Sequence, residues 1–263
     1  MKSGVGSPPA ARRGDLVGLR LPERISACLF DLDGVLTETA VLHATAWKQA
    51  FDELLARRAG PGQHFVPFDA VADYDDYVDG RPRLEGTRAF LRARGIDLPE
   101  GSADDPPGAG SVHGVARRKN DLVLDLMEHR GVAVYPGSLH FLDEVRRRSL
   151  QTAVVSSSAN TVAVLRAAGL DEVFDACVDG VLADREHLHG KPAPDTYLEA
   201  ARQLGVDPSR AAVFEDALAG VEAGRAGGFG LVVGVDRVGQ ADSLLSHGAD
   251  VVVGDLAELI VAG

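Results

Sequence analysis

The second half of the chain alternates short β-branched runs with helical patterns, and this alternation restricts the possible folds most strongly. From Val132 onward each apolar run is followed by about ten residues with apolar positions at helical spacing. Strands joined by single helices form right-handed βαβ units, so the strands are parallel and helices cover both faces of the sheet. The pattern therefore predicts an α/β fold with a Rossmann-like parallel sheet. We expect strands at 25–30, 152–155, 173–178, 211–214, 231–233 and 250–253, and helices at 139–148, 160–168, 194–204, 217–226, 240–247 and 255–261.

A helical segment interrupts this alternation after the first strand. It contains no strand pattern, and helical spacing covers three stretches, 42–58, 86–94 and 115–130. The stretches 60–68 and 95–114 are rich in Gly, Pro and Asp and are expected to be loops. The expected domains are a core of 25–41 plus 132–263, a helical insert at 42–131 and an N-terminal extension at 1–24.

Charge and composition exclude several classes of function. The 263-residue chain has a net charge of −12, which argues against nucleic acid or an anionic membrane as the main partner, because such partners need a basic surface. No apolar run approaches the roughly 18 residues of a transmembrane helix, and the first 24 residues lack the apolar centre of a signal peptide. Cys28 and Cys177 form neither a disulfide framework nor a zinc motif. We expect a cytoplasmic protein. The negative net charge does not exclude a small anionic substrate, because a local basic pocket or a bound metal can override the overall field.

Two carboxylates follow the first predicted strand directly. The apolar run that ends at Phe30 continues as Asp31, Leu32, Asp33 and Gly34. In open α/β sheets chemistry collects where strands end, and two anions at a strand tip repel each other unless a cation or a proton lies between them. The segment therefore fits a magnesium-assisted enzyme with a carboxylate nucleophile. The alternative is a surface turn, in which Asp-Gly pairs are common.

Three hydroxyls follow the strand predicted at 152–155. Ser156, Ser157 and Ser158 precede Asn160, which we expect to cap the next helix. The free N–H groups of a helix N-terminus, together with these hydroxyls, would suit a phosphate group. The alternative is a plain capping sequence.

A lysine and a second acidic pair complete the set. Lys191 lies between Gly190 and Pro192, without the upstream glycine of a P-loop, and the chain has no GxGxxG fingerprint. Glu215 and Asp216 follow the strand predicted at 211–214, where they could hold a hard cation such as Mg²⁺. Taken alone, the lysine could be a surface residue and the acids could complement a helix N-terminus. In chain order, however, the four segments supply a nucleophile, hydroxyl and N–H donors, a lysine and metal-binding carboxylates, which together suit phosphoryl transfer.

These segments resemble the four motifs of the haloacid dehalogenase superfamily of phosphotransferases. The match runs, in order, through Asp31-Leu32-Asp33-Gly34-Val35-Leu36-Thr37, Ser156, Lys191 and Glu215-Asp216. The second aspartate of the first motif is typical of phosphatases and phosphomutases, and the helical insert is similar to the family's mobile cap. Further matches resemble the β-phosphoglucomutase branch, namely Glu38 to Ala40, His43, Trp47, Arg118 to Asp121, Tyr135 to Gly137 and Ser156 to Asn160. The chain departs from that branch at Asp79-Gly80, where the branch has Lys-Gly, and at Ala159, where it has Lys.

The resemblance implies a role for each matching residue. It implies that Asp31 is the nucleophile, that Asp33 is the general acid and base, and that Lys191 and Ser156 neutralise the phosphoryl oxygens. It implies a Mg²⁺ ion held by Asp31, the backbone carbonyl of Asp33, Glu215 and Asp216. It implies substrate contacts from Gly34, Thr39, His43, Trp47, Gly80, Arg83, Ser157, Ser158 and Asn160.

The activity implied is that of a mutase. It would convert β-D-glucose 1-phosphate to D-glucose 6-phosphate through an aspartyl-phosphate, with glucose 1,6-bisphosphate as intermediate and activator. The same four motifs also suit a sugar-phosphate phosphatase with water as acceptor. His43, Thr39 and Arg83 favour the mutase. A third alternative, a non-enzymatic phosphosugar-binding module, is disfavoured because every catalytic position is filled.

Overall fold

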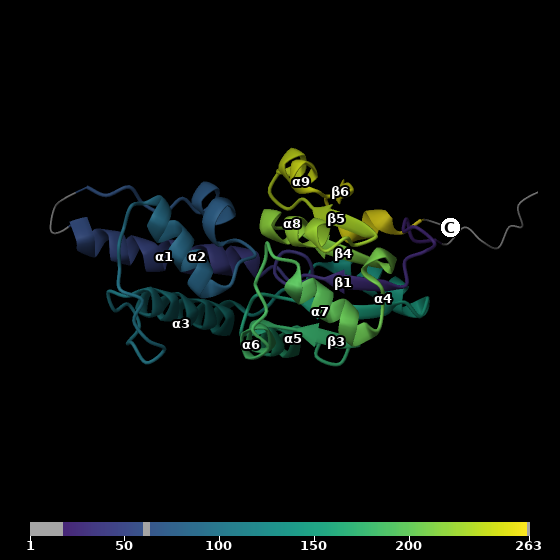
Figure 1. The fold of residues 1–263 in the computed structure, drawn as a ribbon, viewed down its shortest axis with the longest axis horizontal. Helices are drawn as coiled ribbons and strands as arrows, with labels where there is room; N and C mark the ends of the chain where they lie inside the picture. Colours follow the sequence, from purple (N-terminus) through teal and green to yellow (C-terminus); the bar gives the residue numbers. More distant parts are fainter. Residues whose placement is uncertain (1–17, 60–63, 262–263) are drawn as a thin grey trace, which may run out of the picture.

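The protein is described by a computed structural model over residues 18–59 and 64–261. Its described strands form one six-stranded parallel sheet in the order β3-β2-β1-β4-β5-β6 (Figure 1). The strands are β1 (Ala27–Phe30), β2 (Gln151–Val155), β3 (Ala176–Val178), β4 (Ala211–Glu215), β5 (Leu231–Val235) and β6 (Val251–Val253). The predicted α/β fold class is confirmed.

The first strand lies in the middle of the sheet. Phe30, the last residue of β1, is in register with Val154 of β2 and Phe214 of β4. The residues that follow these three strands therefore meet at one edge of the sheet. The chain passes outward from β1 to β2 and β3 and then returns to β4 on the other side of β1. In a sheet with such a reversal of strand order, the crevice for a ligand lies at the carboxyl ends of the central strands.

Helices cover both faces of the sheet, whose strands are buried on either side as is usual for parallel sheets. On one face, α4 (Pro136–Arg147), α5 (Thr161–Ala167) and the 3₁₀ helix η3 (Leu256–Leu259) pack over a stack of aromatic rings. On the other face lie α7 (Asp195–Leu204), α8 (Leu218–Ala226) and α9 (Ala241–His247). The short helices α6 (Gly180–Arg185) and η2 (Pro208–Arg210) lie in the connections before β4.

The helical insert forms a second lobe beside the sheet (Figure 1). It consists of α1 (Ala40–Ala59), the π-helix η1 (Tyr74–Val78), α2 (Arg83–Ala93) and α3 (Val112–Arg130). This lobe has its own core, in which the rings of Phe51, Phe68 and Phe90 pack with centroids 4.0 to 5.2 Å apart. Because the apolar side chains of the lobe pack against each other, its polar side chains can line the side of the lobe that faces the sheet.

The structure departs from the sequence predictions in several elements. The strand expected at 173–178 covers only Ala176–Val178, and the helix expected at 255–261 is the shorter η3. Helix α3 begins at Val112, inside the loop expected at 95–114, because Ser111 caps it by accepting a hydrogen bond from the Gly114 N–H at 3.0 Å. Helices η1 and α6 were not expected. Of the loop expected at 60–68, residues 60–63 lie outside the described part of the chain.

The expected N-terminal extension is described only from Gly18 onward. Its described part lies against the end of the chain, with an antiparallel bridge between Leu19 and Ile260. The Arg20 N–H donates to the Leu259 carbonyl at 2.8 Å, and the Val261 N–H donates to the Gly18 carbonyl at 2.8 Å. Within the described residues, no helix combines the length and apolarity needed to cross a membrane.

Candidate active site

Three carboxylates meet at the carboxyl edge of the sheet. Asp31 follows β1, Glu215 ends β4 and Asp216 follows it, and one oxygen from each lies within 4.8 Å of the others. All three side chains are buried. A Cβ added at Gly34, where φ is +86°, would lie 1.6 Å from Oδ2 of Asp216. The turn formed by the first motif, residues 31–37, therefore approaches Asp216 so closely that only glycine fits at position 34. We call this segment the first-motif turn.

Lys191 pairs with two of these carboxylates. Its Nζ lies 2.5 Å from Oδ1 of Asp31 and 2.5 Å from Oε1 of Glu215, and the residue is buried. The Tyr197 hydroxyl also donates to Oε1 of Glu215, at 2.7 Å. Burial by itself lowers the pKa of Lys191, but the two carboxylates outweigh burial, so its pKa lies above the ordinary lysine value. Lys191 is therefore a permanent buried cation beside Asp31.

The charge balance of this edge favours a bound cation. One lysine faces three buried carboxylates, and burial followed by the repulsion between neighbouring carboxylates raises the pKa of Asp216 well above its ordinary value. Burial is also the largest cause of the raised pKa of Asp31. A divalent ion would remove this repulsion, and an all-oxygen donor set suits a hard cation such as Mg²⁺. The residues present therefore fit a metal ion.

Asp33 lies outside this group of three and belongs to a separate hydrogen-bonded chain. The Thr39 hydroxyl donates to Oδ1 of Asp33, and the hydroxyl oxygens of Thr37 and Thr39 are 2.6 Å apart. His43 Nε2 lies 3.7 Å from Oδ1 of Asp33 and is buried without a hydrogen-bond partner. Asp33 is thus oriented by residues from both the first-motif turn and the start of α1.

The serine loop after β2 connects the core to the insert. The Ser157 hydroxyl donates to the Gly80 carbonyl at 2.7 Å, and the Ser158 N–H donates to Oγ of Ser156 at 3.1 Å. Asn160 stands at the N-cap of α5, but its side chain makes no cap bond. The capping role expected for its side chain is therefore wrong, because the Asn160 amide donates instead to Oδ1 of Asn120 in α3, at 3.0 Å.

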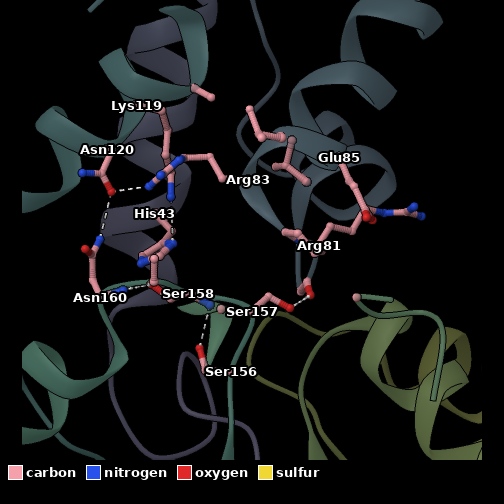
Figure 2. Close-up of a pocket in the computed structure, with 18 of the residues that line it drawn as sticks. His43, Arg81, Arg83, Glu85, Lys119, Asn120, Ser156, Ser157, Ser158 and Asn160 are labelled. Atoms are coloured by element: carbon pink, nitrogen blue, oxygen red, sulfur yellow. Dashed lines mark hydrogen bonds between the residues drawn. The ribbon is translucent and has the colours of Figure 1, made fainter. Parts of the chain in front are cut away.

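The insert contributes cations to the same site (Figure 2). The Arg83 guanidinium donates to Oδ1 of Asn120, and Lys119 Nζ lies 3.0 Å from His43 Nδ1 and 5.0 Å from the centre of the Trp47 ring. Burial, followed by the nearby Arg83, lowers the pKa of Lys119 to about 7. Burial, followed by Lys119, lowers the pKa of His43 to about 4. His43 is therefore neutral at physiological pH, and Lys119 is only partly charged.

A cavity of about 930 Å³ separates the core from the insert. Of the residues singled out from the sequence, its walls include Asp31, Asp33, His43, Trp47, Gly80, Arg83, Ser156, Ser157, Ser158, Asn160 and Asp216. Four others, Gly34, Thr39, Lys191 and Glu215, lie behind this wall and contact residues that line it.

The chain was compared with known families and proteins. The family model of the haloacid dehalogenase-like hydrolases matches residues 25–228. The chain belongs to this family. It is 56% identical to a β-phosphoglucomutase of Mycobacterium bovis over 92% of this chain and 94% of that protein. It is 31% identical to the fructose-1-phosphate phosphatase YqaB of Escherichia coli, over 80% of this chain and 96% of that protein.

The solved structures agree with this assignment. The crystal structure of a β-phosphoglucomutase from Clostridium difficile aligns with a TM-score of 0.70 and 25% identity, covering 89% of this chain and 93% of that chain. The resemblance inferred from the four motifs is confirmed, and as a haloacid dehalogenase-like protein the chain has the expected fold.

The sequence predicted no site role for Lys119, Tyr197 or Asp79. Tyr197 holds Glu215 from α7, and no motif pointed to it. Asp79 lines the cavity from the insert, and burial raises its pKa to about 7. Its signal was present in the sequence, as a departure from the Lys-Gly pair of the β-phosphoglucomutase branch, but its position against the core could come only from the fold.

Proposed function

We propose that this protein is a β-phosphoglucomutase that converts β-D-glucose 1-phosphate to D-glucose 6-phosphate through an aspartyl-phosphate and a bisphosphate. The observation that carries the proposal is the two-sided cavity. Its core wall holds Asp31 and Asp33, and its insert wall holds Arg83 and Lys119. A bisphosphate has two anionic ends, so it needs cationic groups on both sides. Lys191 and the proposed metal ion supply them behind the core wall, and Arg83 and Lys119 supply them on the insert wall. The 56% identity to a protein named β-phosphoglucomutase supports the same reaction.

The residues of the core wall carry the phosphoryl transfer. Asp31 attacks the phosphoryl group, the bond from phosphorus to the sugar oxygen breaks, and the resulting aspartyl-phosphate then passes the group to a sugar hydroxyl and restores the free carboxylate. One difficult transfer thus becomes two easier ones. Lys191 and Ser156 neutralise the equatorial oxygens of that group. Asp33 takes the proton from the attacking sugar hydroxyl and returns it to the leaving one, a role worth about 10²–10⁴-fold. The contacts from Thr39 and His43 orient Asp33 for this task.

The metal of this site is proposed to be Mg²⁺. Asp31, the backbone carbonyl of Asp33, Glu215 and Asp216 would hold it, with Gly34 allowing the close approach of the two loops. When bound, the ion neutralises charge on the transferring phosphoryl group. Lys191 and Tyr197 hold Glu215 in place.

The insert is proposed to be a cap that closes over the substrate. Residues 42–131 would form the cap, residues 25–41 plus 132–263 the catalytic core, and residues 1–24 an N-terminal extension. Arg83 would bind the non-transferring phosphate bidentately, because a planar guanidinium matches phosphate oxygens. His43, Trp47, Gly80, Ser157, Ser158 and Asn160 would contact the sugar or its second phosphate. Closure keeps water away from the aspartyl-phosphate, which a mutase requires.

A sugar-phosphate phosphatase is the second candidate. It would use the same core residues with water as the acceptor, and the similarity to the fructose-1-phosphate phosphatase of Escherichia coli favours keeping it. For either activity we propose a cytoplasmic enzyme whose partner is a small sugar phosphate rather than a nucleic acid or a membrane.

Product analysis separates the two candidates. The enzyme is supplied with Mg²⁺, β-D-glucose 1-phosphate and a trace of glucose 1,6-bisphosphate as activator, and both glucose 6-phosphate and inorganic phosphate are measured. We expect glucose 6-phosphate to form far faster than phosphate. If inorganic phosphate is the main product from every sugar phosphate supplied, the mutase proposal fails and the phosphatase replaces it.

A further inference from the structure

The loop between β5 and α9, residues 236–240, reaches both backbone segments that carry the proposed metal ligands. It lies beyond the fourth motif, and none of its side chains lines the cavity. One of its residues contacts the first-motif turn and another contacts Asp216. We call this segment the β5–α9 loop.

Arg237 holds the first-motif turn. Its Nε donates to the Gly34 carbonyl at 2.8 Å, and a terminal nitrogen donates to the Val35 carbonyl at 3.4 Å. The other terminal nitrogen donates to the Gly254 carbonyl at 2.9 Å, which ties the turn to the end of β6. The guanidinium also lies 3.6 Å from the centre of the Tyr135 ring. The Gly254 carbonyl and the Tyr135 ring therefore fix the position of the Arg237 side chain, which donates hydrogen bonds to two carbonyls of the first-motif turn.

Gln240 holds the other segment. Its side-chain amide donates to the Asp216 carbonyl at 3.1 Å. The loop between these two residues is tied to itself, because Oδ1 of Asp236 accepts hydrogen bonds from the Val238, Gly239 and Gln240 N–H groups at 2.7 to 3.2 Å. Arg237 and Gln240 thus belong to one pre-organised turn.

The two segments that this loop joins have little freedom to move. Gly34 lies so near Asp216 that an added Cβ would be 1.6 Å from Oδ2 of Asp216. The buried carboxylates on either side repel each other in the absence of a cation, so a link from behind adds to the β1–β4 pairing and to Lys191 in opposing their separation. Polar groups that orient metal ligands from behind commonly change metal affinity about 10–100-fold when they are removed.

We propose that Arg237 and Gln240 are positioning residues that hold the Gly34 turn and Asp216 at the separation the metal ion needs. The inference rests on the magnesium-dependent reaction proposed above. It assigns to the β5–α9 loop a role in metal affinity and in the placement of Asp33, without any contact between the loop and the substrate.

The test compares two substitutions at Arg237 with one matched control. Arg237→Met keeps an unbranched aliphatic side chain and removes the donors, and Arg237→Lys restores one charged donor nitrogen. The control is Arg24→Met, since Arg24 likewise donates to a backbone carbonyl, that of Gly230 at 2.7 Å, at the opposite edge of the sheet. The Mg²⁺ dissociation constant is measured by calorimetry, and kcat, KM and Tm are measured for each variant.

We expect Arg237→Met to weaken Mg²⁺ binding about tenfold or more and to lower kcat, with a smaller change in the KM for sugar phosphate. Arg237→Lys should recover part of the loss, and Arg24→Met should leave Mg²⁺ binding unchanged. Gln240→Leu supplies an independent variant in case Arg237→Met does not fold, with an expected loss of a few-fold. If Tm falls while Mg²⁺ affinity and kcat stay unchanged in the folded variants, the role of the loop is structural only and the inference is overturned.

This result is distinguishable from a failure of the proposed function. If the wild-type protein released only inorganic phosphate, the mutase proposal would fail, and weakened Mg²⁺ binding in Arg237→Met would still support the positioning role. If the wild-type protein formed glucose 6-phosphate and both variants bound Mg²⁺ normally, only the positioning role would fail.

Discussion

The two walls of the cavity differ in how their polar side chains are paired. On the core wall, Lys191 contacts Asp31 and Glu215, and Glu215 also accepts from Tyr197. On the insert wall, His43, Arg81 and Arg83 each have a buried ring or guanidinium nitrogen without a hydrogen-bond partner. Among the described residues, only Thr196 adds another such side-chain atom.

This difference indicates a division of labour. A buried polar group without a partner costs roughly 1–3 kcal/mol, so its persistence on one wall is explained if a ligand supplies the partner. The core wall has its electrostatics built before substrate arrives, as stabilisation of a transition state requires. The insert wall completes its hydrogen bonds with the substrate. The following experiments test this contrast, beginning with the largest expected effect.

Asp31→Asn should reduce turnover to background while the fold is retained. The amide is a poor nucleophile and a poorer metal ligand than the carboxylate. Steady-state kinetics with a sugar phosphate, and a thermal melt for the fold, provide the measurement. Residual turnover within about tenfold of wild type would place the nucleophile elsewhere and would break the assignment of chemistry to the core wall.

Asp33→Ala should lose about 10²–10⁴-fold in kcat and keep its Mg²⁺ affinity. The reason is that the Asp33 side chain lies outside the group of three carboxylates, so only its backbone carbonyl would contact the ion. Calorimetric titration with Mg²⁺ is the decisive measurement. A large loss of affinity would make the carboxylate itself a ligand.

Lys191→Ala should lose about 10²–10³-fold in kcat, because it removes the fixed cation beside the transferred phosphoryl group. Its matched control is Lys48→Ala, since Lys48 forms a partly exposed ion pair with Asp52 at 2.9 Å within the insert. The control should leave kcat/KM within about twofold, as expected for a surface pair of roughly 0–1 kcal/mol. Similar effects of both substitutions would contradict the special role of the core wall.

Arg83→Ala should weaken the use of glucose 1,6-bisphosphate about 10–100-fold, corresponding to the loss of charged hydrogen bonds worth about 1.5–3 kcal/mol. Hydrolysis of acetyl phosphate, which has no second phosphate, should change much less. The control is Arg94→Ala, because Arg94 belongs to the same helical lobe but pairs with Asp73 away from the cavity. Equal losses of activity with glucose 1,6-bisphosphate and with acetyl phosphate would contradict the proposed contact between Arg83 and the second phosphate.

Lys119 should produce the smallest effect, a dependence of substrate affinity on pH. Its lowered pKa of about 7 means that it is protonated below that pH and loses its charge as the pH rises through it. The KM for sugar phosphate should therefore increase above about pH 7 in the wild-type enzyme. Lys119→Arg keeps the charge at all these pH values, so its KM should stay flat over the same range. If the KM of Lys119→Arg also increased over this pH range, the titrating group would be a residue other than Lys119.

Local sequence patterns were sufficient to predict most of the sheet and the four motifs. Apolar runs bounded by polar residues identified β1, β2 and β4, and the carboxylates and serines directly after them came from the same reading. Shorter elements were less accessible. The η1 and α6 helices are five and six residues long, too short for a clear helical period.

Residues that act through distant contacts were not accessible in this way. Tyr197 reaches Glu215 from 18 positions away, and Arg237 reaches Gly34 from 203 positions away. Neither residue belongs to a local motif. Asn160 is a further example. Its place before a helix predicted that its side chain would cap that helix, but Asn120 lies close enough in the fold to accept a hydrogen bond from its amide instead.

The sequence by itself determined which segments become strands and which chemical groups stand at their ends, because these follow from the spacing of apolar residues along a few neighbouring positions. The tertiary structure alone decided which of those groups meet. The register of β1 with β2 and β4 brings Asp31 to Ser156 and Glu215, and the packing of α1 against α3 within the insert brings Lys119 to His43, 76 positions away in the chain. These meetings depend on how whole elements pack, and packing is a property of contacts between distant segments rather than of any local pattern.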